Sequence, residues 1–187
     1  MSQFERPNIS QMQGYTSGEQ PQDGRSIKLN TNENPYPPSP MVAAAIKAFA
    51  TEQLRVYPQP DAKVLRQAIA DHHEVGIDSV VVTHAGDEAL RLAVTTFVAS
   101  GGVVASTEPT YSLYPVLAQI QDAQMFTRDL AADWSLPDDF ADAVNAAGAQ
   151  LTFVVNPHAP SGYLNSHAAL ALLAEQIDGV LLVDEAY

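Results

Sequence analysis

Four groups of polar and aromatic residues follow short apolar runs that have the length of β-strands. In a mainly parallel sheet, ligands bind at the carboxyl ends of the strands. Residues at these places are therefore the first candidates for chemistry. The groups are Thr83–Glu88, Glu108–Tyr114, Asn156–Gly162 and Asp184–Tyr187.

The first group places a glycine and two acidic residues at the start of a predicted helix. Backbone N–H groups at such a start have no partner within the helix, and the helix dipole favours negative charge there. Gly86, Asp87 and Glu88 are therefore candidates for a site that binds a phosphate group through the backbone. The alternative is an ordinary capped helix start with acidic residues in its first turn.

The other three groups offer an aromatic ring, a rigid loop and a carboxylate. Tyr111 follows an apolar run and could stack on a planar ring, although such a tyrosine often only packs a loop. The prolines and the glycine of Asn156–Gly162 predict a tight turn. Asp184 directly follows an apolar run, where a buried carboxylate is costly unless it has a partner.

Several common catalytic and nucleotide-binding patterns are absent from the sequence. The apolar run before Asp184-Glu185 is similar to an element of P-loop ATPases, but no G-x-x-x-x-G-K-[ST] segment precedes it. There is no G-x-G-x-x-G fingerprint, and Ser161 lies in no G-x-S-x-G segment. His72-His73-Glu74 lacks the spacing of H-E-x-x-H, so we predict no metal site.

Apolar periodicity predicts an α/β domain in which short strands alternate with amphipathic helices around a mainly parallel sheet. Residues 1–38 are expected to form an N-terminal arm and loop, and residues 39–187 the domain. The predicted strands are 80–82, 103–105, 124–127, 151–155 and 180–183. The predicted helices are 40 to about 53 with Ser39 as its N-cap, one from 61, one after Asp87, 113–120 and 168–177. The helix after Asp87 is expected to bury Leu90, Ala93, Val94, Phe97 and Val98.

The composition restricts the class of protein further. The 187 residues carry a net charge of −13, which makes nucleic acid and anionic membranes poor partners. No apolar run is long enough for a transmembrane helix, and the N-terminus has no signal-peptide pattern. The absence of cysteine excludes a disulfide scaffold and is compatible with a cytoplasmic protein.

The order of these groups along the chain carries more information than any one of them. Taken together, they resemble the histidinol-phosphate aminotransferase branch of the fold-type I, class I and II aminotransferases, over about residues 15–187. The segments that carry the resemblance are Asn32–Tyr36, Val56–Pro58, Gly86–Leu90, Pro109–Tyr114, Asn156–Gly162 and Asp184–Tyr187.

This resemblance implies the three-layer α/β/α large domain of a pyridoxal-phosphate transferase, and pyridoxal 5'-phosphate as its cofactor. Asp184 would pair with the pyridine nitrogen, Tyr187 with the ring hydroxyl, and Tyr111 would stack on the ring. The backbone N–H groups of Gly86, Asp87 and Glu88 would hold the phosphate.

The resemblance also implies partners and further site residues. Tyr57 would reach across a homodimer interface to the partner's phosphate. Tyr15 and Asn34 would lie near the small amino-acid substrate, and a 2-oxo acid would be the amino acceptor. Asn156 is a further cofactor-binding candidate.

Three departures from the family pattern affect these expectations. Ala159 stands where the family has an asparagine that bonds the ring hydroxyl, so Asn156 or His158 would have to replace it. Ala85 stands where a glycine is common. The lysine that carries the cofactor covalently, the Schiff-base lysine, has no match among Lys28, Lys47 and Lys63. We therefore expect the chain to be the N-terminal half of such an enzyme and to be inactive alone.

The sequence leaves more than one function open. The first is transamination between L-histidinol phosphate and 2-oxoglutarate in histidine biosynthesis. Another aminotransferase or an amino-acid-phosphate decarboxylase of the same fold is an alternative. A third reading, from a different class, is a non-catalytic α/β module that binds a phosphate ligand or a partner chain.

Overall fold

The computed structural model describes residues 3–15, 18–22 and 24–187, and the chain divides into two compact units. The first unit comprises residues 1–15 and 83–187, and the second comprises residues 16–82. The expected arm, residues 1–38, therefore contributes to both units. Residues 1–2, 16–17 and 23 of that arm lie outside the described residues.

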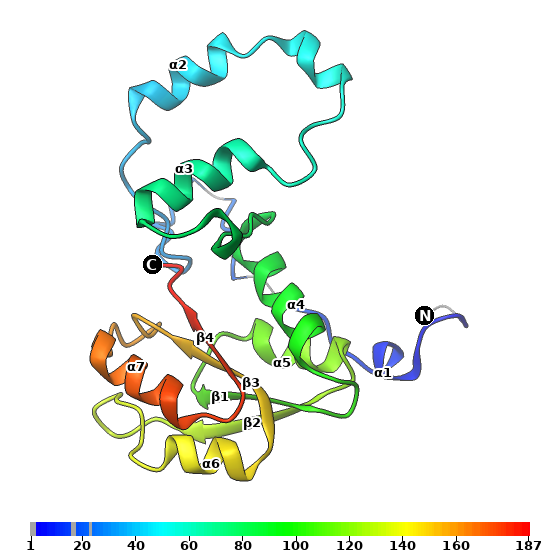
Figure 1. Ribbon diagram of the computed structural model, residues 1–187, viewed down its shortest axis with the longest axis vertical. Helices are drawn as coiled ribbons and strands as arrows, with labels where there is room; N and C mark the ends of the chain where they lie inside the picture. The colour runs from blue at the N-terminus through cyan, green and yellow to red at the C-terminus, as the bar shows by residue number, and fades with distance from the viewer. Residues whose placement is uncertain (1–2, 16–17, 23) are drawn as a thin grey trace. The chain divides into compact units, whose positions relative to one another are not determined.

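The first unit is built on a parallel sheet of four strands in the order β2-β1-β3-β4 (Figure 1). This confirms the predicted parallel sheet, and each strand overlaps the segment that the sequence predicts. Parallel neighbours place all four carboxyl ends at one edge of the sheet. The strands are β1 (Val103–Glu108), β2 (Gln124–Asp129), β3 (Ala149–Val155) and β4 (Val180–Asp184).

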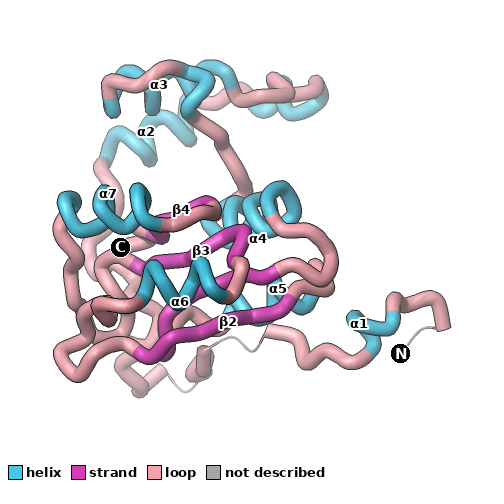
Figure 2. Tube along the Cα trace, turned by 60° about the horizontal axis from the view of Figure 1, so that its bottom comes forward, coloured by secondary structure: helices cyan, strands magenta, loops and turns pink. Residues whose placement is uncertain are grey.

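Helices cover both faces of this sheet (Figure 2). One face packs against α4 (Ala85–Phe97) and α5 (Leu113–Ile120), and the other against α6 (Phe140–Ala146) and α7 (His167–Gln176). The three-layer α/β/α prediction is therefore confirmed for this unit. The bounds of α5 are those predicted, whereas the sequence analysis missed α6, which has only seven residues.

Alternation along the strands produces two separate cores. On β3, Phe153 packs toward α4 and α5, and its neighbour Val154 packs toward α6 and α7. Leu90 and Val94 on α4 and Val98, directly after it, are buried as predicted, four residues apart. The prediction was wrong for Phe97, which is 47% exposed: it is the last residue of α4 and lines an open depression beside Asn145, Gly148 and Gly179 instead of the core.

A short N-terminal helix, α1 (Pro7–Ser10), attaches the start of the chain to α5. The Arg6 guanidinium donates to the carbonyl of Ile120 at 2.8 Å, and the Asn8 amide donates to the carbonyl of Gln119 at 2.8 Å. The last carbonyls of a helix have no partner within it, so these bonds cap the end of α5.

The described part of the second unit contains two helices and two short 3₁₀ turns. The α2 helix (Pro40–Ala48) begins as predicted, with the Ser39 hydroxyl accepting from the Met41 N–H at 3.3 Å. It ends five residues earlier than predicted because Phe49 has an extended backbone, and a 3₁₀ turn, η1, follows. The remaining elements are η1 (Thr51–Arg55), α3 (Lys63–His73) and η2 (Ile77–Ser79).

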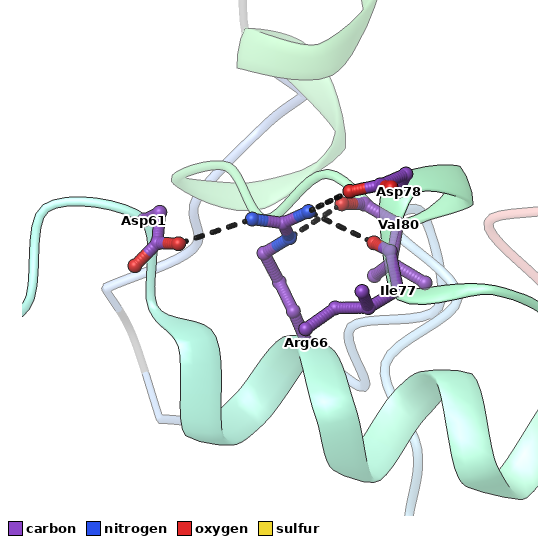
Figure 3. Close-up of polar contacts among 5 residues, drawn as sticks. All are labelled: Asp61, Arg66, Ile77, Asp78 and Val80. Atoms are coloured by element: carbon purple, nitrogen blue, oxygen red, sulfur yellow. Dashed lines mark hydrogen bonds and ion pairs between the residues drawn. The ribbon is translucent and has the colours of Figure 1, made fainter.

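The predicted strand over residues 80–82 is not a strand in the structure. The Arg66 guanidinium bonds one carbonyl of this segment and one of the preceding η2 turn: Nε donates to Val80 and Nη2 to Ile77, each at 2.8 Å (Figure 3). Val81 is 78% exposed, so the apolar run does not enter a core here. Arg66 also forms an ion pair with Asp61 at 3.2 Å, so its guanidinium links the start of α3 to η2.

Substitution of Arg66 tests this arrangement. Arg66→Met keeps the side-chain length but removes every donor, so we expect the second unit to lose about 1–3 kcal/mol of unfolding free energy. Faster amide hydrogen exchange in residues 75–84 should accompany that loss. Arg55→Met, an exposed position on η1, is the control. Equal exchange in the two variants would contradict the assigned role of Arg66.

Candidate functional site

The carboxyl ends of β3 and β4 are joined beyond the last residues of the strands. Asp184, the last residue of β4, pairs with Val155, and the Asn156 N–H donates to the Asp184 carbonyl at 2.9 Å. Asn156 is buried, and its side-chain amide bonds to Asn165 rather than projecting from the sheet edge. The backbone that carries the Asp184 carboxylate is therefore held by β3, along the one side of β4 that has a strand neighbour.

The partner that a carboxylate needs at this position is Tyr114. The Tyr114 hydroxyl donates to Asp184 Oδ2 at 2.7 Å, and the Ala186 N–H donates to Oδ1 at 3.2 Å. Tyr114 is fully buried and stacks on Phe153 with ring centroids 4.3 Å apart. Sequence reasoning missed Tyr114 as a site residue. The available signal was its position in the first turn of a helix whose Leu117 and Ala118 lie on the same buried face.

Tyr111 connects this carboxylate site to two other elements. Its ring lies edge-on to Tyr114 at 5.6 Å and edge-on to Tyr15 at 6.1 Å. Its hydroxyl makes a long contact of 3.4 Å with Asp87 at the start of α4. The structure thus brings together Tyr15, Asp87, Tyr111 and Asp184 from the predicted set, with Tyr114 as the link.

The phenols of this network stay protonated well beyond physiological pH. Burial raises the pKa of Tyr114 above its ordinary value, and the hydrogen bond to the Asp184 carboxylate raises it further. Burial also raises the pKa of Tyr111, with additional contributions from Tyr15 and Asp87. Both residues therefore act as hydrogen-bond donors and not as bases.

The start of α4 has the features of an anion site. No side chain caps the helix, and a Cβ placed on Gly86 would meet no atom within 4 Å, so the backbone there is open to a ligand. The Glu88 carboxylate accepts from the His84 N–H. The backbone N–H of Glu88 stays the predicted contact for a phosphate. Ala85 has a φ of 65°, a conformation that favours glycine and costs an alanine about 1 kcal/mol.

In the loop after β3, His158 is not free to replace the asparagine missing at Ala159. His158 is buried, and its Nε2 lies 3.0 Å from the Pro109 carbonyl, which can only accept, so Nε2 carries the proton. Its Nδ1 lies 2.7 Å from the Ser161 hydroxyl and accepts from it. His158 therefore ties the loop after β3 to the loop after β1, and neither ring nitrogen is available to a ligand.

The remaining predicted residues are placed as follows. Tyr187 follows β4 and is mostly exposed. Asn34 and Tyr57 belong to the second unit, where Asn34 Oδ1 accepts from the Tyr36 N–H at 2.9 Å and Tyr57 is 100% exposed. Their roles toward a ligand stay predictions. Within the described residues, no cluster of histidine and acidic side chains could hold a metal ion, and no helix has the length and apolarity of a membrane span.

These groups fit one kind of ligand. A fixed carboxylate suits a ring nitrogen, an aromatic side chain suits a planar ring, and open N–H groups at a helix start suit a phosphate. On this fold, the combination defines the class of pyridoxal-phosphate-dependent transferases. The chain belongs to the aminotransferase class I and II family, whose sequence pattern matches residues 25–187.

The chain is similar to particular members of this family. The chain is 38% identical to a histidinol-phosphate aminotransferase of Clostridium botulinum strain Langeland and 39% identical to one of Chromohalobacter salexigens, over its whole length. It also matches the crystal structure of histidinol-phosphate aminotransferase from Sinorhizobium meliloti in complex with pyridoxal-5'-phosphate, with a TM-score of 0.88 at 23% identity. That match covers 100% of this chain and 52% of the other. The chain likewise spans about half the length of the curated relatives it matches, 52% of each.

The raised phenol pKa values make a prediction for alkaline pH. In the unfolded chain these tyrosines ionise near pH 10, whereas in the folded chain they keep their protons at that pH. Their contribution to stability is therefore complete below about pH 10 and is lost as pH rises above it.

Absorbance at 295 nm should show fewer of the seven tyrosines ionising near pH 10 in the folded protein than in urea. Tyr114→Phe should remove one of the late ionisations and leave the early ones unchanged. Ionisation of all seven tyrosines in a single early step would contradict the assigned burial and bonding.

Proposed function

We propose that this chain forms the cofactor-binding part of a pyridoxal-phosphate-dependent aminotransferase that acts on L-histidinol phosphate and 2-oxoglutarate. The observation that carries the proposal is the Asp184 carboxylate, held at the end of β4 by donors on both of its oxygens. The relatives named histidinol-phosphate aminotransferase support the choice of substrate. We place this biosynthetic reaction in the cytoplasm.

The proposed roles combine the family resemblance with the positions of the side chains and backbone groups. Bound pyridoxal 5'-phosphate supplies an electron sink for negative charge at the α-carbon of the substrate. Asp184 would hold a proton on the ring nitrogen, and Tyr111 would exclude water from one ring face. The N–H groups of Gly86, Asp87 and Glu88 would bind the phosphate, and Tyr187 would donate to the ring hydroxyl.

A second candidate is a module that binds a phosphate ligand without catalysis. One observation favours it: Ala159 offers no side-chain donor. The intact Asp184, Tyr111 and α4 start favour the first candidate, since a phosphate module has no need for a carboxylate aimed at a ring nitrogen.

Ligand binding separates the two candidates without depending on the Schiff-base lysine. Pyridoxamine 5'-phosphate carries an amine and binds without a covalent bond, so its fluorescence reports the site directly. Asp184→Asn should weaken its binding by roughly tenfold to a hundredfold, since a hydrogen bond to a charged group contributes about 1.5–3 kcal/mol. Asp178→Asn, an exposed aspartate just before the amino end of β4, is the matched control.

Two results would contradict the aminotransferase proposal. One is equal affinity of the wild type and Asp184→Asn for pyridoxamine 5'-phosphate. The other is a product of the natural gene that carries pyridoxal 5'-phosphate yet transfers no amino group from L-histidinol phosphate to 2-oxoglutarate. Tight binding of inorganic phosphate with no preference for the pyridine ring would favour the phosphate module.

We also propose a homodimer formed through the second unit. The α2 helix has no buried residue, although it carries several apolar side chains. Large exposed apolar patches usually mark an interaction site, and Tyr57 adjoins this one in sequence. The exposed apolar residues are Met41, Val42, Ile46, Phe49, Leu54, Val56 and Tyr57.

Light scattering tests the dimer. We expect twice the chain mass for the wild type and a single chain mass for Ile46→Asp with Leu54→Asp, because two buried charges are costly at an apolar interface. Leu164→Asp, on an exposed residue of the first unit, should leave the dimer intact. A monomeric wild type would exclude the proposed interface.

A further inference from the structure

We infer that Tyr114 is a positioning residue: its hydroxyl fixes the Asp184 carboxylate in the orientation that a ring nitrogen requires. This inference rests on the proposed function, because it assigns Tyr114 a role in the same site. Tyr114 does not touch the ligand in this account and acts only through Asp184.

The geometry of the Asp184 carboxylate indicates this role for Tyr114. Each of the carboxylate oxygens receives one donor, from Tyr114 at 2.7 Å and from the Ala186 N–H at 3.2 Å. Two donors on two oxygens fix both the position and the plane of a carboxylate. The Ala186 donor lies on the same loop and would move with it, whereas Tyr114 lies 70 residues away on α5. Of these two donors, therefore, only Tyr114 is anchored outside the β4 segment.

Tyr114 is itself held in place by the residues packed around it. Its ring stacks on Phe153 of β3 with an interplanar angle of 16°. The residues that flank it on α5, Leu113, Leu117 and Ala118, are buried in the same core. Because the donor is rigid, its hydrogen bond fixes the carboxylate relative to the sheet core.

The hydroxyl of Tyr114 lies where an apolar ring would pack equally well. The environment of Tyr114 is apolar, and a buried hydroxyl without a partner destabilises a protein. A phenylalanine would fill nearly the same volume and would make the same ring contacts with Phe153 and Tyr111. The hydroxyl therefore adds one thing, a donor aimed at Asp184 Oδ2.

Tyr114 also relates the two groups that would contact the ring. It bonds the carboxylate through its hydroxyl and meets the Tyr111 ring edge-on at 5.6 Å. One rigid side chain thus sets the position of the carboxylate relative to the aromatic face. Removing the hydroxyl should disturb the carboxylate and leave Tyr111 in place.

The experiment uses the wild-type chain, Tyr114→Phe, Asp184→Asn and the double variant, each with pyridoxamine 5'-phosphate labelled with ¹⁵N in its ring. Tyr163→Phe is the control, since no hydrogen bond from its hydroxyl occurs among the described residues. We expect Tyr114→Phe to weaken binding by about threefold to tenfold and to shift the ring-nitrogen resonance toward the deprotonated value. Tyr114→Phe should have little further effect in the Asp184→Asn background.

An unchanged ring-nitrogen resonance in Tyr114→Phe would overturn the inference, because a purely structural tyrosine changes stability and not the protonation of the ligand. If the wild type binds no pyridoxamine 5'-phosphate, the proposed function fails, and urea unfolding of the same four ligand-free proteins decides the inference. Non-additive losses of unfolding free energy would sustain Tyr114 as the residue that fixes Asp184. Additive losses would overturn it.

Discussion

A carboxylate at the carboxyl end of a parallel strand needs donors from neighbouring elements, and the structure of the first unit provides them from two directions. The Asp184 backbone is held by β3 and by the N–H of Asn156. Its carboxylate is held by Tyr114, which in turn depends on the packing of α5 against β3. The sheet order and the α5 packing are therefore conditions for a functional group at this position.

The same packing extends the site to the other predicted groups. The stacked pair of Tyr114 and Phe153 sets the position of α5, and Tyr111, just before that helix, reaches toward Asp87 at the start of α4. The N-terminal arm joins through Arg6, which caps α5, and through Tyr15, which meets Tyr111. A ring nitrogen, a ring face and a phosphate would thus be served by elements that share one core.

Local sequence signals predicted most of this unit. The strands β1, β3 and β4 each contain a short apolar run, the helix α5 is mostly apolar, and alternation of strands with helices indicates a parallel sheet. Residues 80–82 have the same pattern, yet they form no strand here. The Val80 carbonyl accepts from Arg66, fourteen residues earlier, and no local pattern reveals a guanidinium that bonds a backbone at that separation.

The sequence suggests members of the candidate site but not the connections between them. Asp184, Tyr111 and the start of α4 were identified from their places after strands and from the family resemblance. Tyr114 was not, because its hydroxyl meets Asp184 only through the packing of elements 70 residues apart. Asn156 and His158 were proposed as ring-hydroxyl donors. Both ring nitrogens of His158 are taken by Pro109 and Ser161, whereas the role of Asn156, which bonds Asn165, stays a prediction.

The central claim is that the carboxyl edge of the sheet and the start of α4 bind a phosphorylated pyridine. A map of backbone amide chemical shifts on adding pyridoxamine 5'-phosphate tests it most directly. The account predicts the largest shifts at Gly86, Asp87, Glu88, Tyr111, Asp184 and Tyr187. Shifts concentrated at the opposite edge of the sheet, around Gly148 and Gly179, would contradict it.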